Sequence, residues 1–183
     1  KSNEYTAAAL YKLNKWKYDF QFLGGIYQTD FVLGTGFAGN IKEAGFKGEL
    51  SYFRPKTNSL DTSESLSLSI MADQTFKNDW YISVATLYNS HPSNVFSITG
   101  NIYNSNLSAK MLFPFRYSFQ ATFLKTISPI SSFNFSFIYS PEKNTLILFP
   151  TFSWNVATNF DLDFTAQSFF FEQLHSYKNF GTG

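Results

Sequence analysis

The segment Phe133–Ser140, with the sequence FNFSFIYS, decides the fold class. Phenylalanines and a tyrosine occupy its alternate positions, and Asn or Ser fills all but one of the positions between them. Because successive side chains of a β-strand point to opposite faces, the segment predicts a strand with one aromatic face and one face of mostly small, polar groups. Such a strand needs an apolar environment on one side and a polar environment on the other.

The same two-residue alternation recurs along most of the chain. Counted at every second residue, the clearest apolar rows are Trp16–Ile26, Leu66–Ala72, Trp80–Tyr88, Tyr117–Phe123, Leu146–Val156 and Phe160–Ala166. No segment has the 3.6-residue period of an amphipathic helix. We therefore expect ten strands and the start of an eleventh, at 4–13, 16–27, 30–40, 45–54, 64–76, 80–89, 117–127, 132–140, 145–157, 160–171 and from about Phe180 onward.

The composition points away from an ordinary soluble domain. Of the 183 residues, 20% are aromatic and only 15% are charged, whereas soluble domains carry about 25% charged residues. No apolar run approaches the roughly 20 residues of a membrane-spanning helix. The formal net charge of +1 gives no basis for binding nucleic acid, and the absence of cysteine excludes disulfides.

The strand lengths and the connections point to a membrane barrel. Strands of ten to twelve residues exceed the usual five or six of soluble sheets and match a tilted strand that crosses a bilayer. Connections at one rim are all short, whereas those at the other include long ones, predicted at Arg54–Ser63, Ser90–Arg116 and Glu172–Asn179, besides short ones at Gln28–Thr29 and Pro141–Asn144. Short turns at one rim and longer loops at the other are typical of transmembrane β-barrels.

The positions of the large aromatics indicate which face meets lipid. Tyr and Trp favour the two membrane–water interfaces, and here they lie near strand ends, as Trp16, Tyr18, Trp80, Tyr88, Tyr117, Tyr139 and Trp154. A soluble barrel or sandwich would turn these apolar rows inward. Ten aromatic rows would overpack a small barrel interior, and an exterior of Ser, Thr, Asn and Gln with so few charges would be unusual. We therefore expect the apolar rows to face lipid and the polar rows to face a lumen.

The expected fold class is all-β, an antiparallel up-and-down transmembrane β-barrel. Residues 1–183 are expected to form one barrel domain. If the short turns are periplasmic, the first strand runs inward from outside, and an even-stranded barrel then needs a further strand upstream. The full barrel is expected to have twelve or more strands, about fourteen by analogy with the even-numbered barrels of this class. This chain would then be the C-terminal portion, with its last strand cut off.

Two segments carry a resemblance to a known family. GTGFAGNIKEAGFKGELSYF (34–53) and the strand–turn–strand segment LFPTFSWNVATNFDLDF (148–164) resemble bacterial outer-membrane β-barrel proteins, in particular porin-like proteins of the Bacteroidetes type. The resemblance implies a location in the bacterial outer membrane, contact with the lipid bilayer and lipopolysaccharide, and passage of small solutes without a cofactor. Such proteins commonly end on a strand with a terminal aromatic residue. This chain ends at Gly183, which supports truncation.

Eight charged residues are candidates to face the lumen. They are Lys12, Lys17, Asp19, Lys47, Glu49, Asp73, Asp161 and Asp163. Two interpretations stay open for them. They form an interior ion-pair network that plugs or stiffens the barrel, or they line a pore and select solutes by charge.

No residue pattern predicts an enzyme. The chain contains neither a GxSxG nor an HExxH motif. Its two histidines, His91 and His175, fall in predicted loops, where solvated histidines are common. Asp161 and Asp163 share a strand face, but their spacing is not that of a known calcium loop. We expect no catalytic, metal or cofactor site, and an outer-membrane hydrolase is only the third hypothesis for function.

Three further features leave alternatives open. The loop Ser90–Arg116 folds either inward as a constriction or outward to contact a partner protein. The glycines of GTGFAG allow either a bend of the sheet or close packing of side chains, and Pro150 suggests a bulge or a misplaced strand. The leading function is a passive porin-like channel for small solutes. The alternative is a non-conducting accessory barrel in an outer-membrane complex.

Overall fold

A computed structural model describes residues 5–56, 63–92, 109–110, 113–173 and 176–182. The described chain is all-β. Its strands are β1 (Thr6–Lys15), β2 (Tyr18–Tyr27), β3 (Asp30–Ile41), β4 (Ala44–Pro55), β5 (Ser65–Thr75), β6 (Trp80–Asn89), β7 (Tyr117–Ser128), β8 (Ser131–Ser140), β9 (Thr145–Ala157), β10 (Phe160–Thr165), β11 (Ser168–Gln173) and β12 (Ser176–Thr182). The 3₁₀ turn η2 (Pro141–Lys143) joins β8 to β9. Within these ranges, no helix has the length and apolar character needed to cross a bilayer.

The strands form one antiparallel, up-and-down sheet. Each strand from β1 to β8 is hydrogen-bonded to the next. The other side of β9 pairs with β10 along one part of its length and with β11 along another. β12 pairs with β11. This order confirms the predicted fold class as far as the antiparallel meander is concerned. The sheet is not closed, because β1 and β12 are its edge strands among the residues described. Closure into a barrel therefore stays a prediction.

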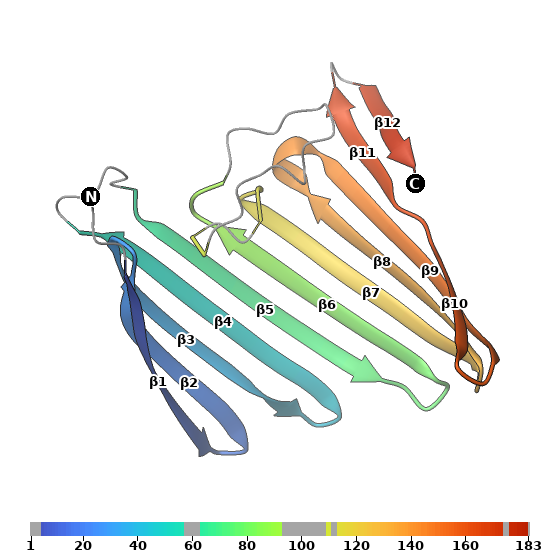
Figure 1. The fold of residues 1–183 in the computed structure, drawn as a ribbon, viewed down its shortest axis with the longest axis horizontal. Coiled ribbons are helices and arrows are strands. Elements are labelled where there is room, and N and C mark those ends of the chain that lie inside the picture. The colour runs from blue at the N-terminus through green and yellow to red at the C-terminus, as the bar shows by residue number, and fades with distance from the viewer. Residues whose placement is uncertain (1–4, 57–62, 93–108, 111–112, 174–175, 183) are drawn as a thin grey trace. The chain divides into compact units, whose positions relative to one another are not determined.

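Residue contacts divide the chain into two compact units. Unit 1 comprises 1–41, 46–70 and 87–116, and unit 2 comprises 42–45, 71–86 and 117–183. Figure 1 shows β1 to β3 side by side in unit 1, and β7 to β9 side by side in unit 2.

The predicted strand 160–171 is present but interrupted. β10 and β11 share one register against β9, since Thr165 pairs with Thr151 and Ser168 pairs with Leu148. The interruption lies opposite Pro150, whose carbonyl accepts a hydrogen bond from the Ala166 N–H at 3.0 Å. Because proline has no N–H to donate in return, the ladder breaks there.

Two other expectations about this region were wrong. On the side of β9 that faces β8, Pro150 pairs with Phe135 in an unshifted register. It therefore causes neither of the two expected irregularities there, a bulge or a misplaced strand. The long connection predicted at Glu172–Asn179 is also absent. β11 continues to Gln173, which pairs with Ser176 at the start of β12. The apolar and polar alternation of FFFEQ and SYKNF is weak, so the sequence pattern underestimated these two strands.

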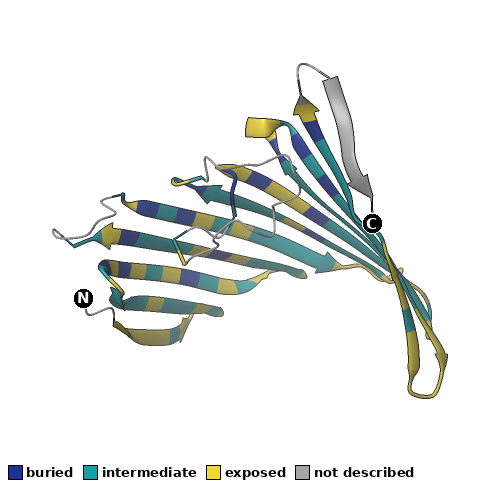
Figure 2. Cartoon of the chain, turned by 45° about the horizontal axis from the view of Figure 1, so that its top comes forward, coloured by how far each residue is buried: buried dark blue, intermediate teal, exposed yellow. Residues whose placement is uncertain are grey.

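Burial in this sheet is inverted relative to a soluble protein. The fully buried polar side chains all lie on one face of their strands, as Asp30, Ser65, Ser67, Ser83, Asn89, Ser118, Ser140 and Thr145. We call this the polar face and the opposite side the apolar face. Leu33 and Phe164, both on the apolar face, are each 60% exposed, whereas Ser65 is 1% exposed. Figure 2 shows the resulting bands of buried and exposed residues along the strands.

The first hairpin turn lies two residues later than expected. Lys15 pairs with Tyr18, so Trp16 and Lys17 form the two-residue turn instead of the start of a strand. Both residues have positive φ, 55° and 66°. Two-residue hairpins of this kind favour Asn-Gly, because those residues tolerate positive φ. The sequence hid this turn, since Trp16 also continues the apolar row of Tyr18, Phe20 and Phe22.

We expect the double substitution Trp16→Asn/Lys17→Gly to stabilise the β1–β2 hairpin. Relief of two strained positive-φ residues should raise the free energy of unfolding by about 1–2 kcal/mol. Urea unfolding of the full-length protein in lipid vesicles measures the change. The single substitution Trp16→Ala, which removes the ring but keeps the strain, is the control and should give no gain. An unchanged midpoint for the double variant would contradict the assignment of a strained turn.

Candidate functional site on the polar face

Seven of the eight predicted lumen residues lie on the polar face. Lys12, Asp19, Lys47 and Glu49 line a groove of about 380 Å³ in unit 1. In unit 2, Asp73 lies on β5 beside Gly45, and Asp161 and Asp163 lie on β10 opposite Asn155 and Ser153. Lys17 is the exception, because it belongs to the β1–β2 turn.

Glycines of β3 and β4 make room for these longer side chains. A Cβ at Gly36 would lie 2.9 Å from Nε2 of Gln21 and 3.3 Å from Cγ of Glu49. A Cβ at Gly45 would lie 2.9 Å from Oδ1 of Asp73. Close packing therefore explains the glycine at position 36 of GTGFAG, which was one of the two alternatives that the sequence left open.

Three carboxylates of the polar face accept hydrogen bonds from neutral partners. Asp19 accepts a hydrogen bond from Nδ2 of Asn14 at 2.7 Å. The two carboxylates of β10 accept hydrogen bonds from β9 in the same way, Asp163 from Ser153 at 2.6 Å and Asp161 from Asn155 at 2.7 Å. None of the eight candidates forms an ion pair with another described residue. The interior ion-pair network therefore has no support in this part of the chain.

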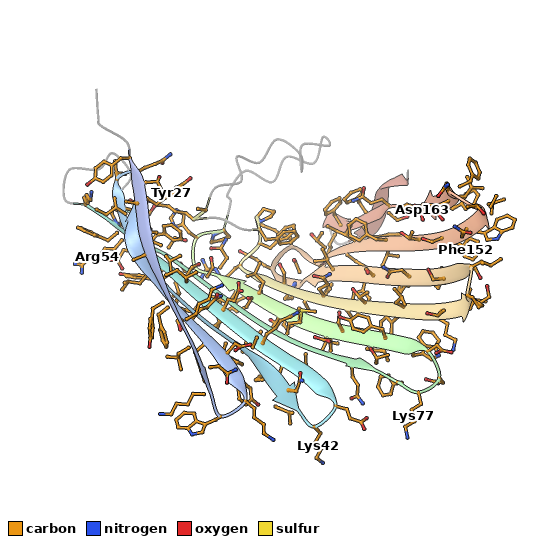
Figure 3. The ribbon with its side chains drawn as sticks, turned by 60° about the horizontal axis from the view of Figure 1, so that its bottom comes forward. Tyr27, Lys42, Arg54, Lys77, Phe152 and Asp163 are labelled. Carbon is orange, nitrogen blue, oxygen red and sulfur yellow. The ribbon has the colours of Figure 1, made fainter. Side chains whose placement is uncertain are left out.

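The β9–β10 pair shows how the two faces are separated. Ser153 pairs with Asp163 and Phe152 pairs with Phe164, so alternation places the carboxylate and the two rings on opposite sides of the sheet. Figure 3 labels Phe152 and Asp163 on these neighbouring strands. The polar ladder continues at Thr151 and Thr165, whose hydroxyl oxygens are 3.2 Å apart. The polar face of unit 2 is thus a hydrogen-bonded surface that carries negative charge.

The described part of the loop 90–116 folds onto the polar face. Lys110 Nζ lies 2.6 Å from Oδ2 of Asp30, at the first position of β3. The Lys110 carbonyl accepts a hydrogen bond from Oγ of Ser65, and Nδ2 of Asn89 donates to the Phe113 carbonyl. Residues 93–108 and 111–112 lie outside the described residues. The described remainder contacts the polar face, and the constriction of a lumen stays a prediction.

The Asp30–Lys110 ion pair is the most buried charged contact described. The Asp30 side chain is 3% exposed and the Lys110 side chain 17% exposed. Oδ1 of Asp30 has no hydrogen-bond partner among the described residues. A buried carboxylate that loses its counter-ion costs roughly 3–5 kcal/mol, because the charge is then left without solvent or partner. This pair therefore holds the loop against the sheet.

Sequence reasoning missed both residues of this pair. Asp30 follows a tight turn and lies two and four residues before Val32 and Gly34, on the same side of β3. Its position on the polar face could therefore be predicted from the alternation. Its partner lies far along the chain in a segment without periodicity. No local pattern connects the two.

We expect Lys110→Met to release the loop. The unpaired Asp30 carboxylate would favour an open loop by about 3–5 kcal/mol. A free-energy change of this size raises the population of the open loop by more than about tenfold. Chymotrypsin cleavage after Phe115 should therefore accelerate by more than about tenfold. The double variant Asp30→Asn/Lys110→Met should restore slow cleavage.

Arg54→Met is the matched control for this prediction. It breaks the Arg54–Glu64 pair, whose side chains are 69% and 56% exposed and 3.7 Å apart. Exposed pairs contribute at most about 1 kcal/mol, so cleavage after Phe115 should change little. Equal acceleration in Arg54→Met and Lys110→Met would show that the buried pair has no special role.

One part of the polar face is not polar. In unit 1, the alternate residues that were expected to be small and polar include Leu10, Leu23, Val32 and Phe53. Together with Tyr27, they line a cavity of about 450 Å³. The sequence interpretation treated only the charged residues of these rows as informative and overlooked the apolar ones. Tyr27 and Phe53 meet edge to face, with ring centroids 6.1 Å apart.

Histidines and acidic residues were the sequence's candidates for catalysis or metal binding. His91 follows β6, and its N–H donates to Oδ1 of Asn89 at 3.0 Å. His175 lies outside the described residues. Where the structure is described, no group of three His, Asp or Glu side chains is placed to hold a metal ion. Comparison with family models, curated proteins and solved structures gives no match.

Proposed function

We propose that this chain is part of a bacterial outer-membrane β-barrel that acts as a passive, porin-like channel for small solutes. The inverted burial carries the proposal. Large apolar side chains are exposed along one face of the sheet, while Ser, Thr, Asn and Asp are buried on the other. In water, a contiguous apolar surface of this extent would promote aggregation. In a bilayer, the same surface contacts lipid, and lipopolysaccharide surrounds the outer end.

The edges of the sheet are consistent with this proposal only if they are paired. A backbone N–H or C=O without a partner in the hydrocarbon core costs several kcal/mol, so membrane-spanning sheets close on themselves. β1 and β12 are edge strands in the described sheet. The proposal therefore includes a partner strand for each of them.

Residues near the strand ends fit a membrane interface. Lys125, the charged residue at the end of the apolar row of β7, donates a hydrogen bond to the Asn78 carbonyl in the β5–β6 turn. Its amine also lies 5.7 Å from the centre of the Trp80 ring. A lysine that directs its amine toward the interface avoids the cost of a charge within the hydrocarbon.

The polar face supports a solute path. It carries both signs of charge, in Lys12, Asp19, Lys47 and Glu49, and small residues such as Gly36 between them. Small side chains leave room for water, and charges that are not paired with one another are available to hydrated solutes. The described ends of the loop 90–116 contact the polar face. This position favours a loop that narrows the solute path, rather than one that docks a partner protein.

We expect arginine substitutions to separate the two faces. Phe135→Arg and Leu148→Arg place a charge on the apolar face and should each cost about 2–4 kcal/mol of membrane-inserted stability. Ser136→Arg and Thr151→Arg, on the polar faces of the same two strands, are the matched controls and should be tolerated. Insertion into lipid vesicles, followed by heat-modifiable gel mobility, measures the difference. Equal tolerance at all four positions would mean that the lipid and lumen faces are wrongly assigned.

Conductance of the full-length protein in a planar bilayer tests the channel itself. We expect stepwise currents from the wild type and larger steps from Lys110→Met, because a released loop widens the path. Arg54→Met should behave as the wild type. Silence in the wild type with currents in Lys110→Met would indicate a plugged barrel. Silence in every variant would reject the channel and favour the non-conducting accessory barrel.

A further inference from the structure

The apolar cavity of unit 1 is the feature that a channel for hydrated solutes does not explain. It encloses about 450 Å³, within the range of roughly 300–1,000 Å³ that is typical of small-molecule sites. Its apolar wall consists of side chains from β1 to β4 and β6, among them Leu10, Leu23, Val32, Phe53 and Leu87. Ala109, from the loop that Lys110 anchors, closes part of it. A water-filled path gains nothing from an apolar wall.

The cavity continues into the polar groove. Gln21 and Glu49 line both the cavity and the groove that holds Lys12 and Lys47. The change from apolar to polar occurs on the two strands that flank β3, where Gln21 and Glu49 both lie beside Gly36. On β2 it lies between Leu23 and Gln21, and on β4 it lies between Phe53 and Glu49. The site thus has an apolar half toward the loop and a polar half toward the turns.

We propose that this two-part site binds an amphipathic small molecule with an aliphatic body and an uncharged, hydrogen-bonding head group. The body occupies the apolar cavity, where it covers Leu10, which is 52% exposed, and the partly exposed Leu23. The head group lies at Gln21 and Glu49. This site does not require that the protein conducts ions, and it goes beyond the channel proposed above.

The charge balance of the polar half decides the head group. Two lysines, Lys12 and Lys47, face two carboxylates, Asp19 and Glu49, in the same groove. The formal charges cancel, so the groove favours neither an anion nor a cation by long-range attraction. All four side chains are exposed, and an ionised head group would meet a like charge as well as an opposite charge there. Alcohol or amide groups can accept from the lysines and donate to the carboxylates without that repulsion.

A photoreactive diazirine analogue of 1-octanol tests the site in the full-length protein held in lipid nanodiscs. Mass spectrometry locates the labelled residues. We expect labelling at Leu23, Val32 and Phe53 on the polar face, and we expect excess 1-octanol to displace it. Octanoate and octylammonium should compete at least about tenfold more weakly, since each carries a charged head group that meets a like charge in the groove.

Two glycine substitutions form a matched pair for this experiment. A Cβ at Gly34 points into the cavity and would lie 3.4 Å from Cβ of Leu23, an ordinary contact. Gly34→Val should therefore fold, fill the cavity and abolish the displaceable labelling. Gly24 lies opposite Leu33, where an added Cβ would meet only Leu33 Cδ2 at 3.9 Å, on the apolar face. Gly24→Val should leave the labelling unchanged.

Each outcome decides for or against the site. Labelling confined to the apolar face, at residues such as Phe22 and Leu33, with no displacement by 1-octanol would show partition into lipid only and would overturn the proposal. Loss of labelling in both glycine variants would also overturn the proposal. It would show that the labelling depends on the intact fold and not on the space inside the cavity. Should Gly34→Val fail to fold, the wild-type competition series decides. Equal competition by the charged analogues would refute the uncharged head group.

Discussion

The hydrogen-bonded register between neighbouring strands is the constraint on which the rest of this structure depends. Side chains alternate with a period of two, so a slip of one residue would move every side chain of a strand to the other face. The register of β8 against its neighbours sets Ser136 beside Thr122 and Phe135 beside Phe123. The same rule holds at Ser153 and Asp163. One continuous polar face and one continuous apolar face within each unit are the consequence.

Packing across the ladder follows from this register. A large side chain on one strand repeatedly lies over a glycine on the next, because the absent Cβ leaves space for it. A Cβ at Gly39 would lie 2.3 Å from the ring of Tyr18, its register partner, and a Cβ at Gly48 would lie 2.7 Å from the ring of Phe37. Glycine weakens a strand by itself, and the covering ring compensates for part of that loss.

The polar face is divided into three kinds of surface that have different physical roles. Carboxylates on β10 are satisfied by neutral donors, lysines and carboxylates share a groove in unit 1, and an apolar cavity lies next to that groove. Asp30 and Lys110 tie the loop to the same side of the sheet through a buried charge pair. Such a pair is costly to break but gives the loop one defined position. A charged groove and an apolar cavity therefore adjoin on the polar face of unit 1.

The sequence by itself determined the all-β class, most strand positions and the two faces, because alternation is a local property that each strand carries alone. Strand 80–89 and strand 145–157 were predicted to the residue. Only the tertiary structure decided the Trp16–Lys17 turn, the interruption opposite Pro150, the Asp30–Lys110 pair and the apolar cavity. Each of these depends on a register partner or on a residue distant in sequence, and no local pattern encodes which distant groups meet.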